Sequence, residues 1–392
     1  MAEQAVLVLN SGSSSLKLAL IEAESGRVLA RGMADRIGSA EATLRFGEEP
    51  ERRLLAGSDH ARALAELLAH FSEAEIGAVG HRVVHGGESF SDSVLIDDAV
   101  LTEIRACVPL APLHNPANLL GIEAAQARFP GLPQVAVFDT AFHQTLPPKA
   151  YFYAVPYAFY EQHRVRRFGF HGTSHHFVAS DTARRLGKPL ASLQLITAHL
   201  GNGVSACAIK NGRSVDTTMG FTPLEGLVMG TRSGDIDPNL HQYLVERTGQ
   251  SLQEITRILN RDSGLLGLSG SSNDMRTLLR EAASGNLRAR LAIDVFCYRL
   301  AKGVLGLCAA LERLDALVFT GGIGEHAAEV RADTLNQLQV LGARLEPELN
   351  QADGERGSGR ITAASSSLLA LVVPTNEELM IARETARVVT RT

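Results

Sequence analysis

Two Gly/Ser-rich turns, each between two apolar strand-like runs, are the segments of this chain best suited to hold an anion. The first follows VLVLN and ends at Lys17, and the second, at 201–203, follows LITAHL. Asn10 and Asn202 occupy matching places and lie 192 positions apart, close to half of the 392 residues. Backbone N–H groups of such turns can surround phosphate oxygens, so the repeat indicates a duplicated fold that binds a phosphate chain.

Arginine, histidine and aspartate side chains recur in four other glycine-rich or strand-ending segments. The candidates for chemistry are Arg82 in HRVVHGG, Asp139 in VFDTAFHQ, His171 in RRFGFHGTSHH and Arg232 in GTRSGDIDP. An arginine in a glycine turn can direct its guanidinium at a phosphoryl group, and the carboxyl end of a strand often carries functional groups. Structural roles stay open: Asp139 could cap a helix, and Arg232 could pair with Asp235 or Asp237, which could instead hold a divalent cation.

Glu377 opens a helical pattern directly after a strand, in PTNEELMIAR. An acidic residue at this place could simply complement the helix dipole. It could instead bind Mg²⁺, which takes one or two protein carboxylates together with waters and phosphate oxygens.

The overall composition excludes several classes of protein. Lysine and arginine number 38 against 43 acidic residues, for a net charge of −5 without a basic run, so we expect no nucleic-acid partner. No run of about 18 apolar residues occurs, so we expect no membrane span. The N-terminus lacks the basic region of a signal peptide and the four cysteines form no CxxC pair, so we expect a cytoplasmic protein with reduced thiols.

Short apolar runs and longer helical patterns alternate along the chain, which favours a mixed α/β fold. Strands are predicted at 5–9, 17–22, 28–32, 135–138, 195–198, 204–209, 316–319 and 368–373. Helices are predicted at 60–71, 286–314 and 377–389, with another starting at Ser272–Asp274. The Pro-rich stretch Leu146–Pro156 is the best candidate for a domain boundary.

Eight motif segments occur along the chain in one order, and together they resemble the acetate kinase, or acetokinase, family from Asn10 to the C-terminus. The segments that carry the resemblance are NSGSSSLK, HRVVHGG, FDTAFHQTLP, RRFGFHGTSH, HLGNG, DTTMGFTPLEGLVMGTRSGDIDP, GGIGE and TNEEL. The resemblance implies an α/β fold of two duplicated ribonuclease-H-like (actin-like ATPase) domains with an interdomain active-site cleft. It also implies domains at 1–147 plus 377–392 and at 148–376, and a homodimer formed through the second domain.

The resemblance assigns roles to the residues that match the family's motifs. It implies catalytic roles for Arg82, Asp139, His171 and Arg232, and a Mg²⁺ site, with Mn²⁺ as the alternative, at Asn10 and Glu377. Acetate would be bound by Arg82 and by an apolar pocket of Val84, Leu113, Phe170 and Pro223. ATP or ADP would be held by Lys17, His199, Leu200, Gly201, Asn202, Gly203, Asp274, Met275, Arg276, Gly322, Ile323, Gly324, Glu325 and His326.

The reaction implied by the resemblance is reversible, Mg²⁺-dependent transfer of the ATP γ-phosphoryl group to acetate, giving acetyl phosphate and ADP. A propionate or short-chain acyl kinase is the first alternative. Val84 distinguishes the two readings, because it should shrink the acid pocket and favour acetate. An acid-independent actin-like ATPase is the second, but it would have no use for Arg82, His171 and Arg232 together. His326 follows GIGE where many family members carry Asn, so the resemblance does not fix the nucleotide preference.

Overall fold

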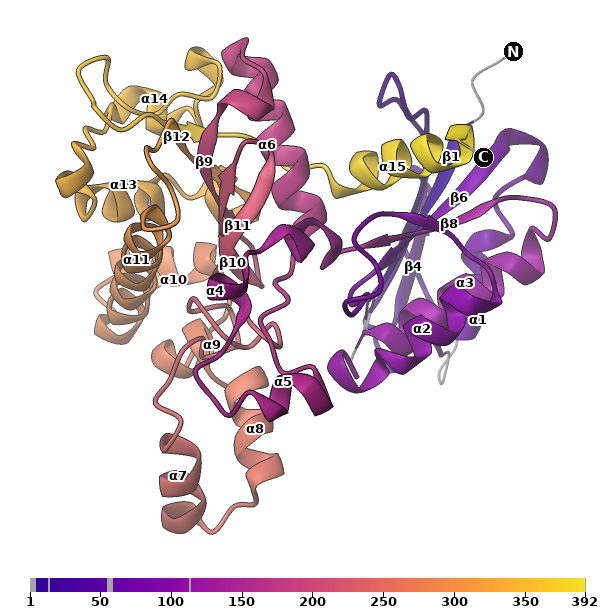
Figure 1. Ribbon diagram of the computed structural model, residues 1–392, viewed down its shortest axis with the longest axis horizontal. Coiled ribbons are helices and arrows are strands. Elements are labelled where there is room, and N and C mark those ends of the chain that lie inside the picture. The colour runs from indigo at the N-terminus through magenta and orange to yellow at the C-terminus, as the bar shows by residue number, and fades with distance from the viewer. Residues whose placement is uncertain (1–4, 13–14, 55–58, 113, 392) are drawn as a thin grey trace. The chain divides into compact units, whose positions relative to one another are not determined.

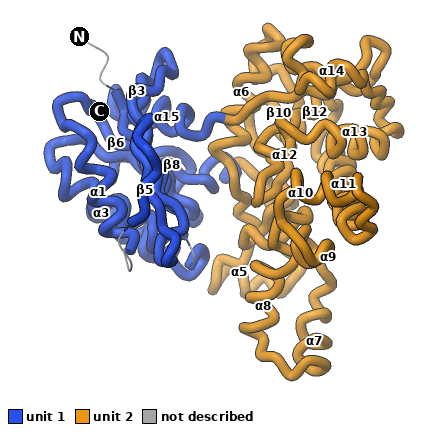
Figure 2. Tube along the Cα trace, turned by 180° about the vertical axis from the view of Figure 1, so that it is seen from behind, with its two compact units in different colours: residues 1–144, 376–392 blue, residues 145–375 orange. Residues whose placement is uncertain are grey.

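The computed structural model describes residues 5–12, 15–54, 59–112 and 114–391. The chain forms two compact units: unit 1 contains residues 1–144 and 376–392, and unit 2 contains residues 145–375 (Figure 2). Each unit is built around its own β-sheet (Figure 1). Helix α15 (Glu377–Arg391) therefore returns the end of the chain to the unit in which β1 begins.

Unit 1 contains an eight-stranded sheet in the order β5-β4-β3-β2-β1-β6-β8-β7. Strands β1 to β5 form an antiparallel meander, β6 and β8 run parallel to β1, and β7 is antiparallel to β8. The strands are β1 (Ala5–Ser11), β2 (Leu16–Ile21), β3 (Val28–Asp35), β4 (Thr43–Phe46), β5 (Arg52–Arg53), β6 (Ile76–Val83), β7 (Val94–Leu95) and β8 (Gln134–Phe138). The helices besides α15 are α1 (His60–Leu68), α2 (Asp98–Ala106) and α3 (Asn115–Arg128).

Alternating side chains assign different helices to the two faces of this sheet. Leu7 and Leu9 of β1 belong to a buried cluster that includes residues of α1 and α3. The other face packs against α15, where Gly80 of β6 lies so close that a Cβ atom there would stand 2.3 Å from Thr385 Oγ1. Helices α1, α2 and α3 accordingly lie on one side of the sheet and α15 on the other (Figure 1).

Unit 2 contains a five-stranded sheet in the order β11-β10-β9-β12-β13. Its strands are β9 (Gln194–Leu200), β10 (Val204–Lys210), β11 (Arg213–Thr217), β12 (Ala316–Thr320) and β13 (Ala370–Val372). Helix α6 (Gly172–Leu186) and helix α11 (Leu287–Cys308) cover opposite sides of this sheet (Figure 1). The other helices are α4 (Pro148–Tyr151), α5 (Ala158–His163), α7 (Leu240–Thr248), α8 (Leu252–Arg261), α9 (Gly264–Ser269), α10 (Met275–Ala283), α12 (Gly321–His326), α13 (Ala328–Asn336) and α14 (Pro347–Gln351).

The two sheets share one connectivity. The run β3-β2-β1-β6-β8 in unit 1 corresponds to β11-β10-β9-β12-β13 in unit 2. In each run three antiparallel strands are followed by two strands parallel to the first of them in sequence. Each of the two glycine turns connects the first strand of its run to the second. The structure thus confirms the duplicated α/β fold that the sequence predicts.

The predicted strands and helices are present with shifted ends, but one central strand is missed. Strand β6 lies between β1 and β8, yet its sequence IGAVGHRV is interrupted by Gly77 and Gly80, which weaken a strand pattern. The short strands β4, β5, β7 and β11 are missed as well. Among the described residues, none of the helices has both the length and the apolar character needed to cross a membrane.

Candidate active site

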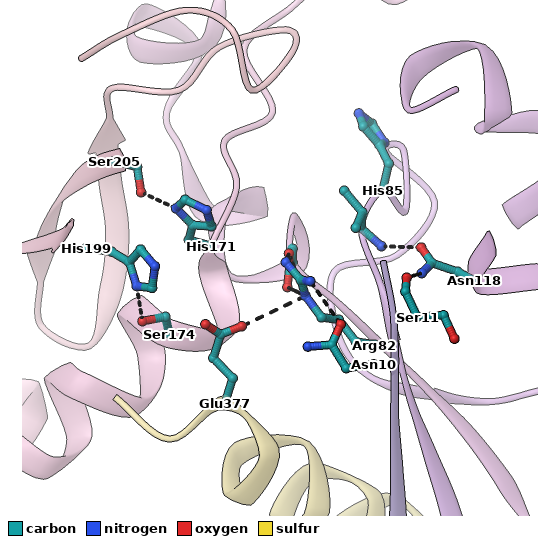
Figure 3. Close-up of polar contacts among 12 residues, drawn as sticks. Asn10, Ser11, Arg82, His85, Asn118, His171, Ser174, His199, Ser205 and Glu377 are labelled. Carbon is teal, nitrogen blue, oxygen red and sulfur yellow. Dashed lines mark hydrogen bonds and ion pairs between the residues drawn. The ribbon is translucent and has the colours of Figure 1, made fainter. Parts of the chain in front are cut away.

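Arg82 lies at the centre of a group of polar side chains in unit 1 (Figure 3). Its Nη2 atom donates to Asp139 Oδ2 at 2.6 Å, and its Nε atom donates to the two oxygens of the same carboxylate at 3.1 and 3.2 Å. Its Nη1 atom donates to Asn10 Oδ1 at 3.1 Å, and Glu377 Oε2 lies 3.9 Å from Nε. The fold thereby gathers residues of β6, β1 and α15 and the residue that follows β8 around one guanidinium.

The carboxylates around Arg82 hold its charge in a place where water has little access. The Asp139 side chain is 1% exposed and the Arg82 side chain is 19% exposed. Burial by itself lowers the pKa of Arg82, but the charges of Asp139 and Glu377 raise it, and the resulting pKa lies above its ordinary value. Arg82 is therefore a cation of fixed charge and orientation.

The oxygen atoms around Arg82 are also suitable ligands for a hard divalent cation. Asn10 supplies an amide oxygen, and Asp139 and Glu377 supply carboxylates. In the described part of the chain, no three His, Cys, Asp or Glu side chains are arranged to hold a metal by themselves. A cation at this place would need further oxygens from water and phosphate, which is how Mg²⁺ is usually bound with nucleotides.

Asn118 fixes the segment that follows β6. Its Oδ1 accepts from the Val84 backbone N at 3.1 Å, and its Nδ2 donates to the Ser11 backbone O at 2.7 Å (Figure 3). The amide thereby ties the end of β1 to the start of the HGG segment, and Val84 is 5% exposed. Leu113, the other unit 1 residue expected in the acid pocket, lies outside the described residues.

Lys17 is the strand partner of Asn10 across β1 and β2, and it lines a pocket of about 300 Å³ on the strands β2 to β4. Arg31 and Arg45 line the same pocket, and Arg31 Nη2 donates to Glu378 Oε2 at 3.0 Å. The serine-rich turn before Lys17 is described at Gly12 and Ser15, where Gly12 N donates to Ser15 O at 2.8 Å.

In unit 2, His171 precedes helix α6 with a left-handed backbone, φ +57°. This conformation is rare for residues other than glycine, costs on the order of 1–3 kcal/mol, and is concentrated at functional sites. The His171 Nδ1 atom lies 2.9 Å from Ser205 Oγ, and its ring centroid is 4.4 Å from that of His199. These two contacts orient the imidazole against strands β9 and β10 (Figure 3).

Gly203 marks a point at which His171 and Arg232 converge. A Cβ atom on Gly203 would stand 3.1 Å from His171 Nε2 and 3.6 Å from Arg232 Nη2. Arg232 Nη1 donates to the Pro223 backbone O at 2.8 Å, and across the described ranges its guanidinium has no carboxylate partner. Burial lowers the pKa of Arg232 from its ordinary value. A partly buried guanidinium that lacks a counter-charge and lies beside an imidazole is suited to bind an anion.

The two aspartates that follow Arg232 have other partners. Asp235 Oδ1 accepts from the Gly226 backbone N at 2.7 Å, and Asp237 Oδ1 accepts from the Asn239 backbone N at 2.8 Å. The alternative in which one of them pairs with Arg232 is therefore wrong. Their carboxylates instead hold turns of the long segment in which Arg232 lies.

A pocket of about 540 Å³ in unit 2 is lined by the β9–β10 turn, the start of α10 and the helix α12. This volume is in the range of small-molecule and cofactor sites. Asp274 caps α10 by accepting from the backbone N atoms of Arg276 and Thr277, as its sequence position predicts. The residues expected to hold the nucleotide that line this pocket are Gly201, Asn202, Asp274, Met275, Arg276, Gly322, Ile323 and His326.

The other residues expected to hold the nucleotide do not line this pocket. His199 Nδ1 is bonded to Ser174 Oγ at 2.8 Å (Figure 3). Glu325 Oε1 accepts from Gly321 N at 2.8 Å and from Thr375 N at 3.1 Å, so its carboxylate fixes the turn that starts α12. The remaining ones are Leu200 and Gly324, which are buried, Gly203, which lies beside His171 and Arg232, and Lys17, which belongs to unit 1.

Sequence reasoning missed Asn273, Leu279 and Ala327, which also line the pocket. Asn273 Nδ2 donates to Asn202 Oδ1 at 3.0 Å and so joins α10 to the β9–β10 turn. A signal for two of them exists, because Asn273 precedes the helix cap and Leu279 is one turn after Met275. Of the unit 2 residues expected in the acid pocket, Phe170 is 2% exposed, and Pro223 accepts a hydrogen bond from Arg232 through its backbone carbonyl.

The sequence has many similar proteins whose names agree with one another. The sequence model described as Acetokinase family matches residues 5–383. An acetate kinase from Deinococcus radiodurans is 57% identical over 389 residues, with 98% of each chain covered. An acetate kinase from Ectopseudomonas mendocina is 54% identical over 390 residues, covering 98% of this chain and 99% of that one. The chain therefore belongs to the acetokinase family.

Solved structures of this family have the same fold. A propionate kinase from Francisella tularensis superposes with a TM-score of 0.92 at 45% identity and covers 98% of this chain and 99% of its own. Porphyromonas gingivalis acetate kinase superposes with a TM-score of 0.91 at 43% identity and covers 98% and 100%. These likenesses extend over both units.

Proposed function

We propose that this protein is an acetate kinase, which transfers the γ-phosphoryl group of ATP reversibly to acetate to give acetyl phosphate and ADP. The observation that carries the proposal is the point beside Gly203 at which His171 Nε2 and Arg232 Nη2 converge. A guanidinium and an imidazole N–H are hydrogen-bond donors suited to the equatorial oxygens of a transferring phosphoryl group, where charge is spread in the transition state. The names of relatives that are 52–57% identical support the same activity.

In this proposal the 540 Å³ pocket holds the nucleotide. The pocket adjoins the β9–β10 turn, whose Gly201 and Asn202 line it while Gly203 contacts the two donors. A nucleoside in the pocket would therefore direct its phosphates along the turn, toward His171 and Arg232. Lys17 is assigned to the nucleotide phosphates by family resemblance, and its cationic pocket with Arg31 and Arg45 supports an anionic ligand.

Arg82 would bind the carboxylate of the acid. A guanidinium presents parallel N–H groups that match a carboxylate, and Asp139 fixes the plane of this one. Asn10 and Glu377 have the oxygen atoms that Mg²⁺ or Mn²⁺ prefers, and the Asp139 carboxylate lies beside the same guanidinium. A bound Mg²⁺ would neutralise charge on the nucleotide phosphates.

The chemistry needs no strong general base. The pKa of acetic acid lies well below 7, so acetate is already the nucleophile. One of its oxygens attacks the γ-phosphorus, the bond to the β–γ bridging oxygen breaks, and ADP leaves with that electron pair. No proton is transferred, so Asp139 is better suited to position Arg82 than to accept a proton. The work of the protein is to bring two anions together and to bind the charge of the transition state.

A propionate or short-chain acyl kinase is the main alternative within the family. The name of the Francisella tularensis neighbour gives this possibility weight. The buried Val84 side chain favours the smaller acid, because a pocket distinguishes a methylene group by about 1–3 kcal/mol. An acid-independent ATPase is the second alternative, and it leaves the buried Arg82–Asp139 pair without a substrate to bind.

We also propose a homodimer formed through unit 2. Helix α11 exposes one apolar stripe, in which Leu287, Leu291, Tyr298 and Leu305 are 83%, 51%, 59% and 37% exposed. Two such helices packed antiparallel about Tyr298 would set Leu291 against Leu305 and Asp294 against Lys302, which makes the stripe self-complementary.

The ATP-dependent reaction favours the cytoplasm as its compartment.

The dimer is tested by light scattering after gel filtration. Tyr298→Asp should reduce the mass from that of two chains to one chain of 42.0 kDa. Tyr243→Asp is the matched control, because Tyr243 is 54% exposed on α7 and lies outside the stripe. A wild-type monomer, or a Tyr298→Asp protein that stays dimeric, would contradict the proposal.

The activity is tested by trapping acyl phosphate as hydroxamate in the presence of ATP and Mg²⁺. Acetate, propionate and butyrate are compared, with ADP release measured in parallel without any acid. Acyl phosphate that depends on acetate, with acetate preferred, is the expected result. ADP release that is independent of acid would replace the kinase with an ATPase, and a preference for propionate would favour the first alternative.

A further inference from the structure

Behind His171 runs a buried chain of hydrogen bonds that the proposed mechanism does not use. His171 Nδ1 lies 2.9 Å from Ser205 Oγ, and the same oxygen lies 2.8 Å from His175 Nε2. The other ring nitrogen of His175, Nδ1, lies 2.7 Å from Thr197 Oγ1. Ser205, His175 and Thr197 are each 0% exposed. The chain therefore leads from the core of unit 2 to the residue beside Gly203.

The elements of unit 2 make this chain rigid. His175 lies one helical turn after His171 in α6, and its backbone N donates to His171 O at 2.9 Å. Ser205 is in β10 and Thr197 is in β9, two strands that are paired through their whole length. The three buried members thus come from a helix or a strand, and His171 is the residue that directly precedes the helix.

The direction of the protons along this chain follows from the hydroxyl at its inner end. A hydroxyl has one proton to donate, and across the described residues Thr197 Oγ1 has His175 Nδ1 as its hydrogen-bond partner. If His175 donated to Thr197, the Thr197 proton would be buried without an acceptor, which is unfavourable. Thr197 therefore donates to His175 Nδ1. His175 Nε2–H then donates to Ser205, and the Ser205 hydroxyl donates to His171 Nδ1.

We propose that Ser205, supported by His175 and Thr197, is a positioning residue that sets the tautomer of His171. Because Nδ1 of the neutral imidazole accepts from Ser205, its proton is on Nε2, the atom 3.1 Å from the point beside Gly203. His171 thereby presents an N–H donor where Arg232 presents its guanidinium. The catalytic use of this donor rests on the proposed function, but the tautomer itself does not.

The tautomer is measured directly by NMR of the full chain labelled with ¹⁵N-histidine. Long-range ¹H–¹⁵N correlations distinguish a protonated ring nitrogen from an unprotonated one, and His171→Asn assigns the signal. We expect Nε2–H at His171 in the wild type, and a mixture of tautomers in Ser205→Ala. A wild-type His171 with its proton on Nδ1 would overturn the proposal, whatever the activity of the enzyme.

Kinetics supply the second readout. Ser205→Ala should lower kcat by about 10- to 100-fold, the range known for hydrogen-bond partners behind metal-binding histidines, and leave KM for ATP within about twofold. Thr197→Val removes the innermost donor at equal size and should act in the same direction but less strongly. It also keeps the test decisive if Ser205→Ala does not fold.

Ser214→Ala is the matched control, because Ser214 is a 0% exposed hydroxyl in β11 of the same sheet whose Oγ atom lies 3.3 Å from Cys207 Sγ. It should leave both the His171 tautomer and kcat unchanged. Unchanged kcat and tautomer in Ser205→Ala and Thr197→Val would overturn the proposal. A wild-type protein with the expected tautomer but without acyl phosphate formation would instead refute the proposed function alone.

Discussion

Arg82 in unit 1 and Arg232 in unit 2 are both partly buried guanidinium groups, but their surroundings are opposite. Arg82 is bonded to the Asp139 carboxylate and lies near that of Glu377, so its pKa is raised above the ordinary value. Arg232 is bonded to a backbone carbonyl, and burial lowers its pKa. The positive charge of Arg82 is balanced by carboxylates in the folded protein, whereas the charge of Arg232 still needs an anion.

This difference indicates a division of work between the units. A guanidinium that is already paired is held in place and can orient a substrate carboxylate without a large change in its own stability. An unpaired guanidinium gains most when charge develops on a group beside it, which is the condition for stabilising a transition state. Substitutions at the two sites should therefore have different kinetic signatures.

The largest effect is expected for Arg232→Ala. Among the described residues, Arg232 is the only guanidinium at the position beside Gly203 that His171 Nε2 also faces. Its removal should lower kcat by about 10³- to 10⁵-fold, as for arginines of this role in other phosphoryl-transfer enzymes. Hydroxamate formation at saturating ATP and acetate measures it. Arg247→Ala is the control, since Arg247 lies on α7 over the Tyr243 ring and should be neutral. A loss of less than tenfold would remove Arg232 from the transition state.

Asp139→Asn should show that Arg82 depends on its partner. Breaking a buried ion pair leaves a charge uncompensated, and although Glu377 remains nearby, we expect a loss of about 3 kcal/mol in the free energy of unfolding. Urea denaturation measures it, and activity should fall with it. Asp98→Asn, on the surface at the start of α2, serves as control. Full stability of Asp139→Asn would mean that Arg82 is not held as the geometry indicates.

Arg331→Lys should affect the nucleotide without affecting the acid. Arg331 is 0% exposed and donates through Nη1 to the carbonyls of Gly324 and Glu325, at the end of the helix that lines the pocket proposed for the nucleotide. Lysine keeps the charge but cannot reproduce the fork of donors, so KM for ATP should rise by about tenfold while KM for acetate stays unchanged. An equal rise in both constants would show a general loss of structure instead.

An effect of similar size to that of Arg331→Lys, but confined to the choice of acid, is expected for Val84→Ala. If Val84 limits the acid pocket, shortening it should improve propionate relative to acetate by about tenfold, the value of one methylene group. The ratio of kcat/KM for the two acids measures it, with Val94→Ala on β7 as the control. An unchanged ratio would remove Val84 from the pocket and leave acid selectivity to other residues.

The duplicated fold and the ends of several elements could be predicted from the sequence because glycine turns and helix caps act locally, whereas the roles of the site residues come from the family's motifs and stay predictions. Asp274, for example, caps α10 where the sequence SND indicates a helix start. The Arg82–Asp139 pair and the absence of a carboxylate at Arg232 depend on tertiary packing and could not be predicted. Strand β6, which carries Arg82, escapes the hydrophobic pattern because Gly80 must be small where α15 crosses it.

The chain of His171, Ser205, His175 and Thr197 also has no sequence signature. Its members come from one helix, the residue before that helix, and two strands, and the two histidines alone have the spacing of a helical pair. Only the pairing of β9 with β10 brings Thr197 and Ser205 to the same imidazole.

The most direct test of the account is to compare the full kinetics of Arg82→Ala and Arg232→Ala with acetate and ATP as substrates. If the division of work is correct, Arg232→Ala loses kcat with KM for acetate nearly unchanged, and Arg82→Ala raises KM for acetate at least tenfold. If both variants lose kcat alone, or if Arg232→Ala mainly raises KM for acetate, the two arginines do not have the distinct roles that their surroundings indicate.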